Sequence, residues 1–105
     1  MVNSWHLLFL NSISSSEIAI YDIVNKEWNI VGPKDAICSS PSFSPNSSKL
    51  AFSCSFDKHL FSIYEYDITS QSMEKITEGD FCDAQPLYLD DNSILFWRGH
   101  RFGGS

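Results

Sequence analysis

Three cysteines and three histidines are the residues of this chain best suited to bind a metal ion. A structural zinc site needs four such ligands, usually in closely spaced pairs, and no such spacing occurs here. Cys38 and Cys82 recur at matching positions and are the best candidates, but small buried thiols are the simpler interpretation. The odd number of cysteines argues against a disulfide framework, so we expect reduced thiols, no metal and no cofactor. The six residues are Cys38, Cys54, Cys82, His6, His59 and His100.

Acidic residues suggest a second kind of site. Asp90, Asp91 and Asn92 form a run that could bind calcium, but the alternating oxygen ligands and the glycine of a calcium loop are absent. We therefore expect a turn, in which side-chain oxygens accept hydrogen bonds from nearby backbone N–H groups. Asp22 and Asp67 recur at the ends of two similar segments, and the same role is expected for them.

Motifs for catalysis are missing from the sequence. It contains no Gly-x-Ser-x-Gly elbow, no phosphate-binding loop and no His-Glu-x-x-His pair, so we expect no enzymatic activity. Aromatic residues on loops and rims can instead anchor a protein or peptide partner. The alternative is that these rings pack between sheets. The candidate partner-binding residues are Trp28, Phe81, Trp97 and Phe102.

Charge and hydropathy exclude two classes of partner. The 105 residues include 13 acidic and 7 basic side chains, with a formal net charge of −6. Lys and Arg do not cluster, so nucleic acid is not an expected partner. The apolar run Leu7–Leu10 is too short for a secretory signal or a membrane span. A cytoplasmic protein without membrane contact is expected.

Strand-forming and turn-forming residues dominate, and no long run of helix formers occurs, so the chain is predicted to be all-β. Lys49–Phe56 alternates in the way expected for a strand with one face in a core. A loop is predicted over 34–40 and another around 78–80. The predicted strands are Trp5–Leu10, Glu17–Val24, Trp28–Val31, Pro41–Ser44, Lys49–Phe56, Phe61–Thr69, Met73–Thr77, Pro86–Leu89 and Ile94–Trp97.

Short motifs recur along the chain at a spacing of 43–45 residues. With four predicted strands in each period, this is the size of one blade of a β-propeller. The matches are Tyr21–Ile23 with Tyr66–Ile68, Pro41-x-Phe43 with Pro86-x-Tyr88, Leu50–Phe52 with Ile94–Phe96 and with Leu7–Phe9, and Cys38 with Cys82.

The most complete unit resembles the TolB-type β-propeller repeat, a relative of WD repeats. In that repeat a Pro-x-aromatic-Ser-Pro-Asp-Gly turn precedes an apolar strand ending in Phe-x-Ser. An Ile-Tyr-x-x-Asp strand and a Leu-Thr ending follow. The chain departs from this pattern at Asn46–Ser47, at Leu89–Asn92 and at Ala19. The matching residues are Pro41, Phe43, Ser44, Pro45, Asn46, Leu50, Phe52, Ser53, Ile63, Tyr64, Asp67, Ile76 and Thr77.

The resemblance implies antiparallel four-stranded propeller blades, about two and a quarter of them, in one domain over 1–105. A partial blade is expected over 4–33, a full blade over 41–77, a partial blade over 86–98 and a tail over 99–105. Blades pack face to face, so the open ends should expose apolar side chains. The side chains expected to be exposed are Phe52, Tyr64, Tyr66 and Trp97.

The resemblance also implies a class of function. The first hypothesis is a non-enzymatic interaction scaffold for a protein or peptide, completed by copies of itself or by the rest of a longer propeller. A trimer with two blades from each chain would make a ring of six, provided that one terminal strand of each chain is left out or displaced. The alternative is the substrate-gating propeller of a prolyl-oligopeptidase-like serine peptidase whose catalytic domain is absent here. A degenerate fragment without its own function is a third possibility.

Overall fold

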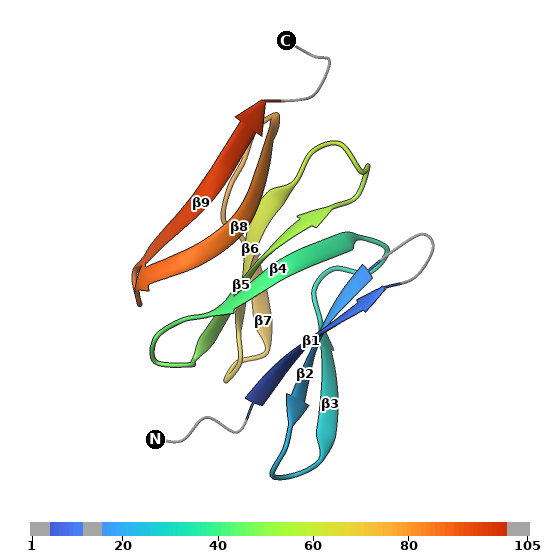
Figure 1. Cartoon of the computed structure of the whole chain (residues 1–105), viewed down its shortest axis with the longest axis vertical. Coiled ribbons are helices and arrows are strands. Elements are labelled where there is room, and N and C mark those ends of the chain that lie inside the picture. The colour runs from blue at the N-terminus through green and yellow to red at the C-terminus, as the bar shows by residue number, and fades with distance from the viewer. Residues whose placement is uncertain (1–4, 12–15, 101–105) are drawn as a thin grey trace.

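The computed structural model describes residues 5–11 and 16–100, and every regular element in this part of the chain is a β-strand (Figure 1). The all-β prediction is confirmed, and each predicted strand is present with shifted bounds. The strands are β1 (Trp5–Asn11), β2 (Ser16–Asp22), β3 (Glu27–Val31), β4 (Ile37–Phe43), β5 (Lys49–Ser55), β6 (Ser62–Asp67), β7 (Ser72–Lys75), β8 (Phe81–Asp90) and β9 (Ser93–His100).

The strands form two open sheets. β2 pairs with β1 and β3, and β4 to β7 follow one another in antiparallel order. A single parallel bridge from Ser16 to Ile37 joins these two groups into the larger sheet. β8 and β9 form the smaller sheet, which a parallel bridge from Cys82 to Phe61 links to the start of β6. We call β1–β3 the first unit, β4–β7 the middle unit and β8–β9 the last unit.

Strand pairing repeats along the chain at a spacing of 44 or 45 residues. His6 pairs with Tyr21 between β1 and β2, and Leu50 pairs with Tyr66 between β5 and β6. The two parallel bridges that join successive units are also 45 residues apart. We call residues at the same register position in different units counterparts. The counterpart of Leu50 is therefore His6, and its predicted match with the start of Leu7–Phe9 is wrong by one residue.

β4 and β8 contain the same irregularity, which explains why both begin earlier than predicted. The pairing register shifts after Ser39 in β4 and after Ala84 in β8, again 45 residues apart. Ser40 and Gln85 occupy these bulges with φ values of 57° and 54°. Each strand therefore continues through polar residues that the sequence suggested would form a loop.

The pairing register of these strands corrects one predicted match. Cys38 pairs with Cys54 between β4 and β5, and Asp83 pairs with Arg98 at the same register position between β8 and β9. The counterpart of Cys38 is therefore Asp83. The predicted match of Cys38 with Cys82 is wrong by one residue, which places the two thiols on opposite faces of their strands.

The apolar core lies between the first and middle units. Phe52 and Tyr64 stack at its centre, with ring centroids 6.3 Å apart and an interplanar angle of 12°. The expected exposure of Phe52, Tyr64 and Tyr66 is wrong, because this side of the middle unit is covered by the first unit; Trp97 is exposed as expected. The buried cluster consists of Ile18, Ile20, Val31, Ala36, Cys38, Leu50, Phe52, Cys54 and Tyr64.

β5 is buried on both faces because it lies between two units. Leu50 and Phe52 point into the core, as the alternating pattern predicted, while Ala51 and Ser53 point toward the last unit. All four are fully buried. The small residues on the second side let β8 approach closely, and the Ser53 hydroxyl donates a 2.7 Å hydrogen bond to the carbonyl of Asp83.

Cys38 and Cys54 form a disulfide across β4 and β5. The expectation of reduced thiols is wrong for this pair, because the register of the two strands places the residues opposite each other. Cys82 remains free, and its thiol donates a hydrogen bond to the carbonyl of His59. The disulfide leaves Cys38 without a thiolate, so the candidate metal site at Cys38 and Cys82 is also wrong.

Candidate interaction surfaces

The four predicted aromatic anchors lie in different parts of the molecule. Trp28 on β3 is 54% exposed and Trp97 on β9 is 72% exposed. Phe81 is half-buried at the start of β8, and the Arg98 guanidinium carbon lies 4.1 Å from the centroid of its ring. Phe102 lies outside the described residues. β3 and β9 are near opposite ends of the molecule, so these rings do not form one site (Figure 1).

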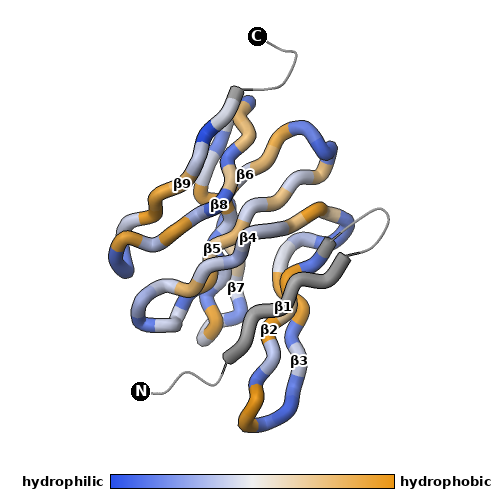
Figure 2. Tube along the Cα trace, viewed as in Figure 1, coloured by the Kyte–Doolittle hydropathy of each residue, from blue (hydrophilic) through white to orange (hydrophobic). Residues whose placement is uncertain are grey.

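The last unit has an exposed apolar surface on the side away from the middle unit. Hydrophobic stretches lie on both β8 and β9 (Figure 2). Leu87 pairs with Leu95, and Ala84 pairs with Trp97, across these two strands. We call these four residues the last-unit face. Sequence reasoning missed both leucines. The signal for them was alternation with inward-facing residues, Leu87 with Tyr88 on β8 and Leu95 with its two neighbours on β9. Their counterparts in the middle unit are small residues: Ser39, Ser42, Ala51 and Ser53.

The first unit also has an exposed surface on the side away from the middle unit. It is formed by Tyr21, Trp28 and Ile30, which we call the first-unit face. The rings of Tyr21 and Trp28 are in contact, with centroids 4.7 Å apart, and more than half of Ile30 is exposed. The counterparts of these residues in the middle unit are Tyr66, Met73 and Lys75.

Each of these two open faces has a counterpart in the middle unit, and that counterpart contacts a neighbouring unit of the same chain. In the middle unit the counterpart of the first-unit face includes Tyr66, which packs against the core shared with the first unit. The counterpart of the last-unit face includes Ala51 and Ser53, which β8 covers. Because equivalent faces of successive units meet in this way, we expect the first-unit and last-unit faces to be complementary.

An ion pair between a buried aspartate and a partly exposed arginine joins β8 to β9. Asp83 is 1% exposed, and its two carboxylate oxygens accept hydrogen bonds from Arg98 Nε at 2.8 Å and Nη2 at 3.0 Å. The hydrogen bond to Asp83 raises the pKa of the Arg98 guanidinium. The counterpart of this pair is the disulfide of Cys38 and Cys54. The same position of the repeat is thus held covalently in one unit and by opposite charges in the next.

We expect Arg98→Met to lower the melting temperature by roughly 5–10 °C, because Asp83 would stay buried without its cation. Circular dichroism during heating measures this change. The double variant Asp83→Leu/Arg98→Met should regain most of the loss, since no unpaired charge remains. A single variant that melts with the unmodified protein would contradict the importance of the pair.

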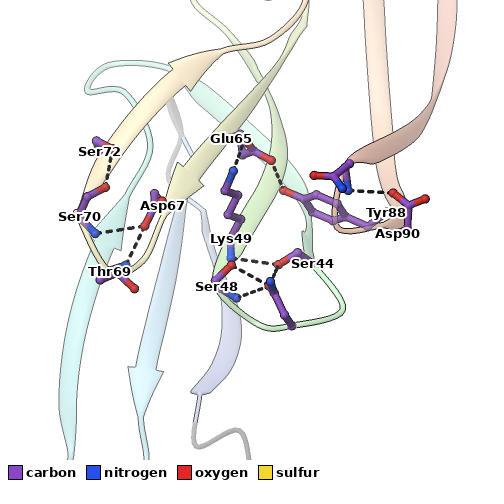
Figure 3. Close-up of polar contacts among 12 residues, drawn as sticks. Ser44, Ser48, Lys49, Glu65, Asp67, Thr69, Ser70, Ser72, Tyr88 and Asp90 are labelled. Carbon is purple, nitrogen blue, oxygen red and sulfur yellow. Dashed lines mark hydrogen bonds and ion pairs between the residues drawn. The ribbon is translucent and has the colours of Figure 1, made fainter.

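A hollow of ≈ 320 Å³ lies between the middle and last units. Glu65 connects its polar side chains: one oxygen accepts a 2.7 Å hydrogen bond from the Tyr88 hydroxyl, and the other is 3.8 Å from Lys49 Nζ (Figure 3). Burial and the contact with Glu65 raise the pKa of Tyr88, so the hydroxyl stays protonated. The lining residues are Lys49, Ile63, Glu65, Ile76, Tyr88, Asp91, Asn92, Ile94 and Phe96.

The recurring aspartates close turns, as predicted. Asp22 and Asp67 each accept hydrogen bonds from the N–H groups two and three residues later, at 3.0–3.2 Å. Figure 3 shows the turn at Asp67. Asp90 accepts a 2.8 Å hydrogen bond from the N–H of Asn92, which confirms a turn there. Within the described part of the chain, no three His, Cys, Asp or Glu side chains gather to hold a metal ion.

Asp57 closes a further turn and makes stability depend on pH. Hydrogen bonds from the N–H groups of Leu60 and His59 lower the pKa of Asp57 from 3.8 to about 2. Since the folded pKa is below the unfolded one, this stabilisation is complete above pH 4 and is lost as the pH falls toward 2.

We expect Asp57→Asn to have a lower melting temperature than the unmodified protein at pH 6, with the difference shrinking toward pH 2. Parallel melting curves at several pH values test this, and a difference independent of pH would contradict it.

No protein-family model matches this chain, and no curated protein matches it. Residues 5–11 and 16–100 include no helix that could cross a membrane. The repeated strand register and the two open faces are the features of the molecule that bear most directly on function.

Proposed function

We propose that this chain is a non-enzymatic protein-interaction module built of TolB-like propeller blades. The repeated register of 44 or 45 residues supports this, as does the four-stranded antiparallel order of the middle unit. In this interpretation the middle unit is a complete blade. Among the described residues the first unit has no counterpart of β4, and the last unit has no counterparts of β6 and β7.

The observation that carries the proposal is the pair of open faces, which we expect to be complementary. A partner that presents a first-unit type of face would cover Trp97, and one that presents a last-unit type of face would cover Trp28. Contacts between two different faces join subunits head to tail, and a ring forms if the rotation closes. The partner is therefore another blade, supplied by a second copy or by the rest of a longer propeller. Each copy contributes three units to a ring joined through these faces, so the mass of the assembly gives the number of copies.

The mass of the chain in solution tests association between copies. We expect light scattering behind a sizing column to give a discrete assembly of more than one chain. Trp97→Asp and Trp28→Asp should each reduce the mass of this assembly, because a charge at the centre of an apolar contact must be desolvated. Mixing the two variants should restore a two-chain complex, since the intact face of one variant meets the intact face of the other.

Phe56→Asp is the matched control, because Phe56 is also more than half exposed but lies on neither open face. It should leave the mass unchanged. A stable single chain at micromolar concentration would overturn closure by copies. If Trp97→Asp alone or Trp28→Asp alone formed the same assembly as the unmodified chain, the head-to-tail arrangement would be contradicted.

A further inference from the structure

The hollow between the middle and last units has the same construction as the apolar core. Six of its lining residues are counterparts of core or core-packing residues, at spacings of 44 or 45 residues. Together they form the two walls of the hollow. Ile63, Glu65 and Ile76 correspond to Ile18, Ile20 and Val31, and Tyr88, Ile94 and Phe96 correspond to Phe43, Leu50 and Phe52.

In the core, the space between these walls is filled by rings from β6. Tyr64 pairs with Phe52 and Tyr66 pairs with Leu50, so both tyrosines face the first unit. The hollow has no such ring, because β9 pairs with β8 alone in the part of the chain that the structure describes. The outer edge of β9 therefore has unpaired backbone groups beside an unfilled apolar space.

We infer that the free edge of β9 binds an extended peptide of a partner protein as an antiparallel strand. Two aromatic side chains at alternate positions of that peptide would lie opposite Phe96 and Ile94 and fill the hollow. Backbone hydrogen bonds supply affinity in this mode of binding, and pockets for alternate side chains supply specificity. The pairing of Tyr64 and Tyr66 of β6 with β5 is the template for the register.

The charges in the hollow indicate uncharged side chains on the peptide. Glu65 already contacts Lys49 and Tyr88, and Asp91 accepts a 3.0 Å hydrogen bond from the N–H of Asn46. No described charge in the hollow therefore requires an opposite charge from the ligand. Ile63, Ile76 and the two β9 residues provide apolar contact for rings.

A folded second copy does not fit this edge. The ligand needs two aromatic rings at positions i and i+2, and among the described strands only β6 has them; β6 is already paired along both edges. An unstructured segment has its backbone groups free. The inference rests on the proposed function in naming a protein partner, but it uses an edge and a hollow that are separate from the two open faces.

Fluorescence anisotropy with a labelled peptide of residues 60–69 tests the inference on the full chain. We expect saturable binding of one peptide to each chain. Tyr64→Ala/Tyr66→Ala in the peptide should weaken binding by roughly tenfold or more, because two buried rings are lost. Glu65→Ala in the peptide should bind as well as the original, since its side chain would point away from the hollow. Equal binding of the double-alanine peptide would overturn the inference.

Two variants of the protein locate the site. Phe96→Ala should lose peptide binding, whereas Leu95→Ala, the neighbour on the opposite face of β9, should keep it. Ile76→Ser is a second test at the 40% exposed margin of the hollow, and it avoids a change within β9. Binding that survives both Phe96→Ala and Ile76→Ser would overturn the assignment.

Light scattering in the presence of peptide separates the two possible occupants of the edge. A larger assembly that the peptide breaks apart would show that a second copy fills the hollow, and it would overturn a peptide partner. Trp97→Asp should stop association while leaving peptide binding intact. A Trp97→Asp variant that lost peptide binding but still associated would instead count against the site at the hollow.

Discussion

Phe52→Ala is expected to lower the free energy of unfolding by roughly 3–5 kcal/mol, the range for a large aromatic side chain removed from a packed core. Phe52 is fully buried and stacks on Tyr64 at the contact between the first and middle units. Its loss would leave a cavity that two units border, and neither unit can close it without moving as a whole. Urea unfolding monitored by circular dichroism measures the change.

Leu95→Ala is the matched control for this prediction. Leu95 also lies on a strand next to a unit contact, but more than half of its side chain is exposed on the last-unit face. The control should change stability by less than about 0.5 kcal/mol at concentrations where the chain does not associate. Equal losses from the two substitutions would show that Phe52 does not lie in a core.

The double variant Cys38→Ala/Cys54→Ala is expected to lose about 3 kcal/mol, because the disulfide closes a loop with a sequence separation of 16 residues. Guanidinium unfolding without reductant measures this loss. Addition of reductant to the unmodified protein should give a similar loss. Cys82→Ala is the control, since Cys82 is outside the disulfide and should change stability much less.

Thiol labelling of the unfolded, unreduced protein provides a direct count. One of the three cysteines, Cys82, should react, and all three should react after reduction. Labelling of all three without reduction would contradict the disulfide.

The strands were predictable because side-chain alternation and turn residues are local signals. Lys49–Phe56 identified β5, and the repeated aspartates identified two turns. The early starts of β4 and β8 were not predictable, since a bulge at Ser40 or Gln85 requires a positive φ that these residue types do not signal. Polar residues before each bulge therefore looked like loops.

The contacts between units were less accessible to sequence reasoning. The disulfide depends on the register of β4 against β5, and a shift of one residue would have separated Cys38 from Cys54. The buried side of Phe52 depended on which neighbouring unit covers it, which alternation alone does not reveal. The hollow beside Ile94 was also not predictable, because no motif marks it; it lies where β9 has no second neighbour among the described strands.

The exchange of a cysteine pair for an Asp–Arg pair at one position of the repeat has an evolutionary consequence. Cys38 with Cys54, and Asp83 with Arg98, show that one backbone geometry accepts either solution. Disulfides persist in oxidising compartments and are reduced in the cytosol, whereas an ion pair does not depend on redox conditions. A lineage that duplicates such units could therefore move between compartments by substituting one pair of residues, with the architecture unchanged.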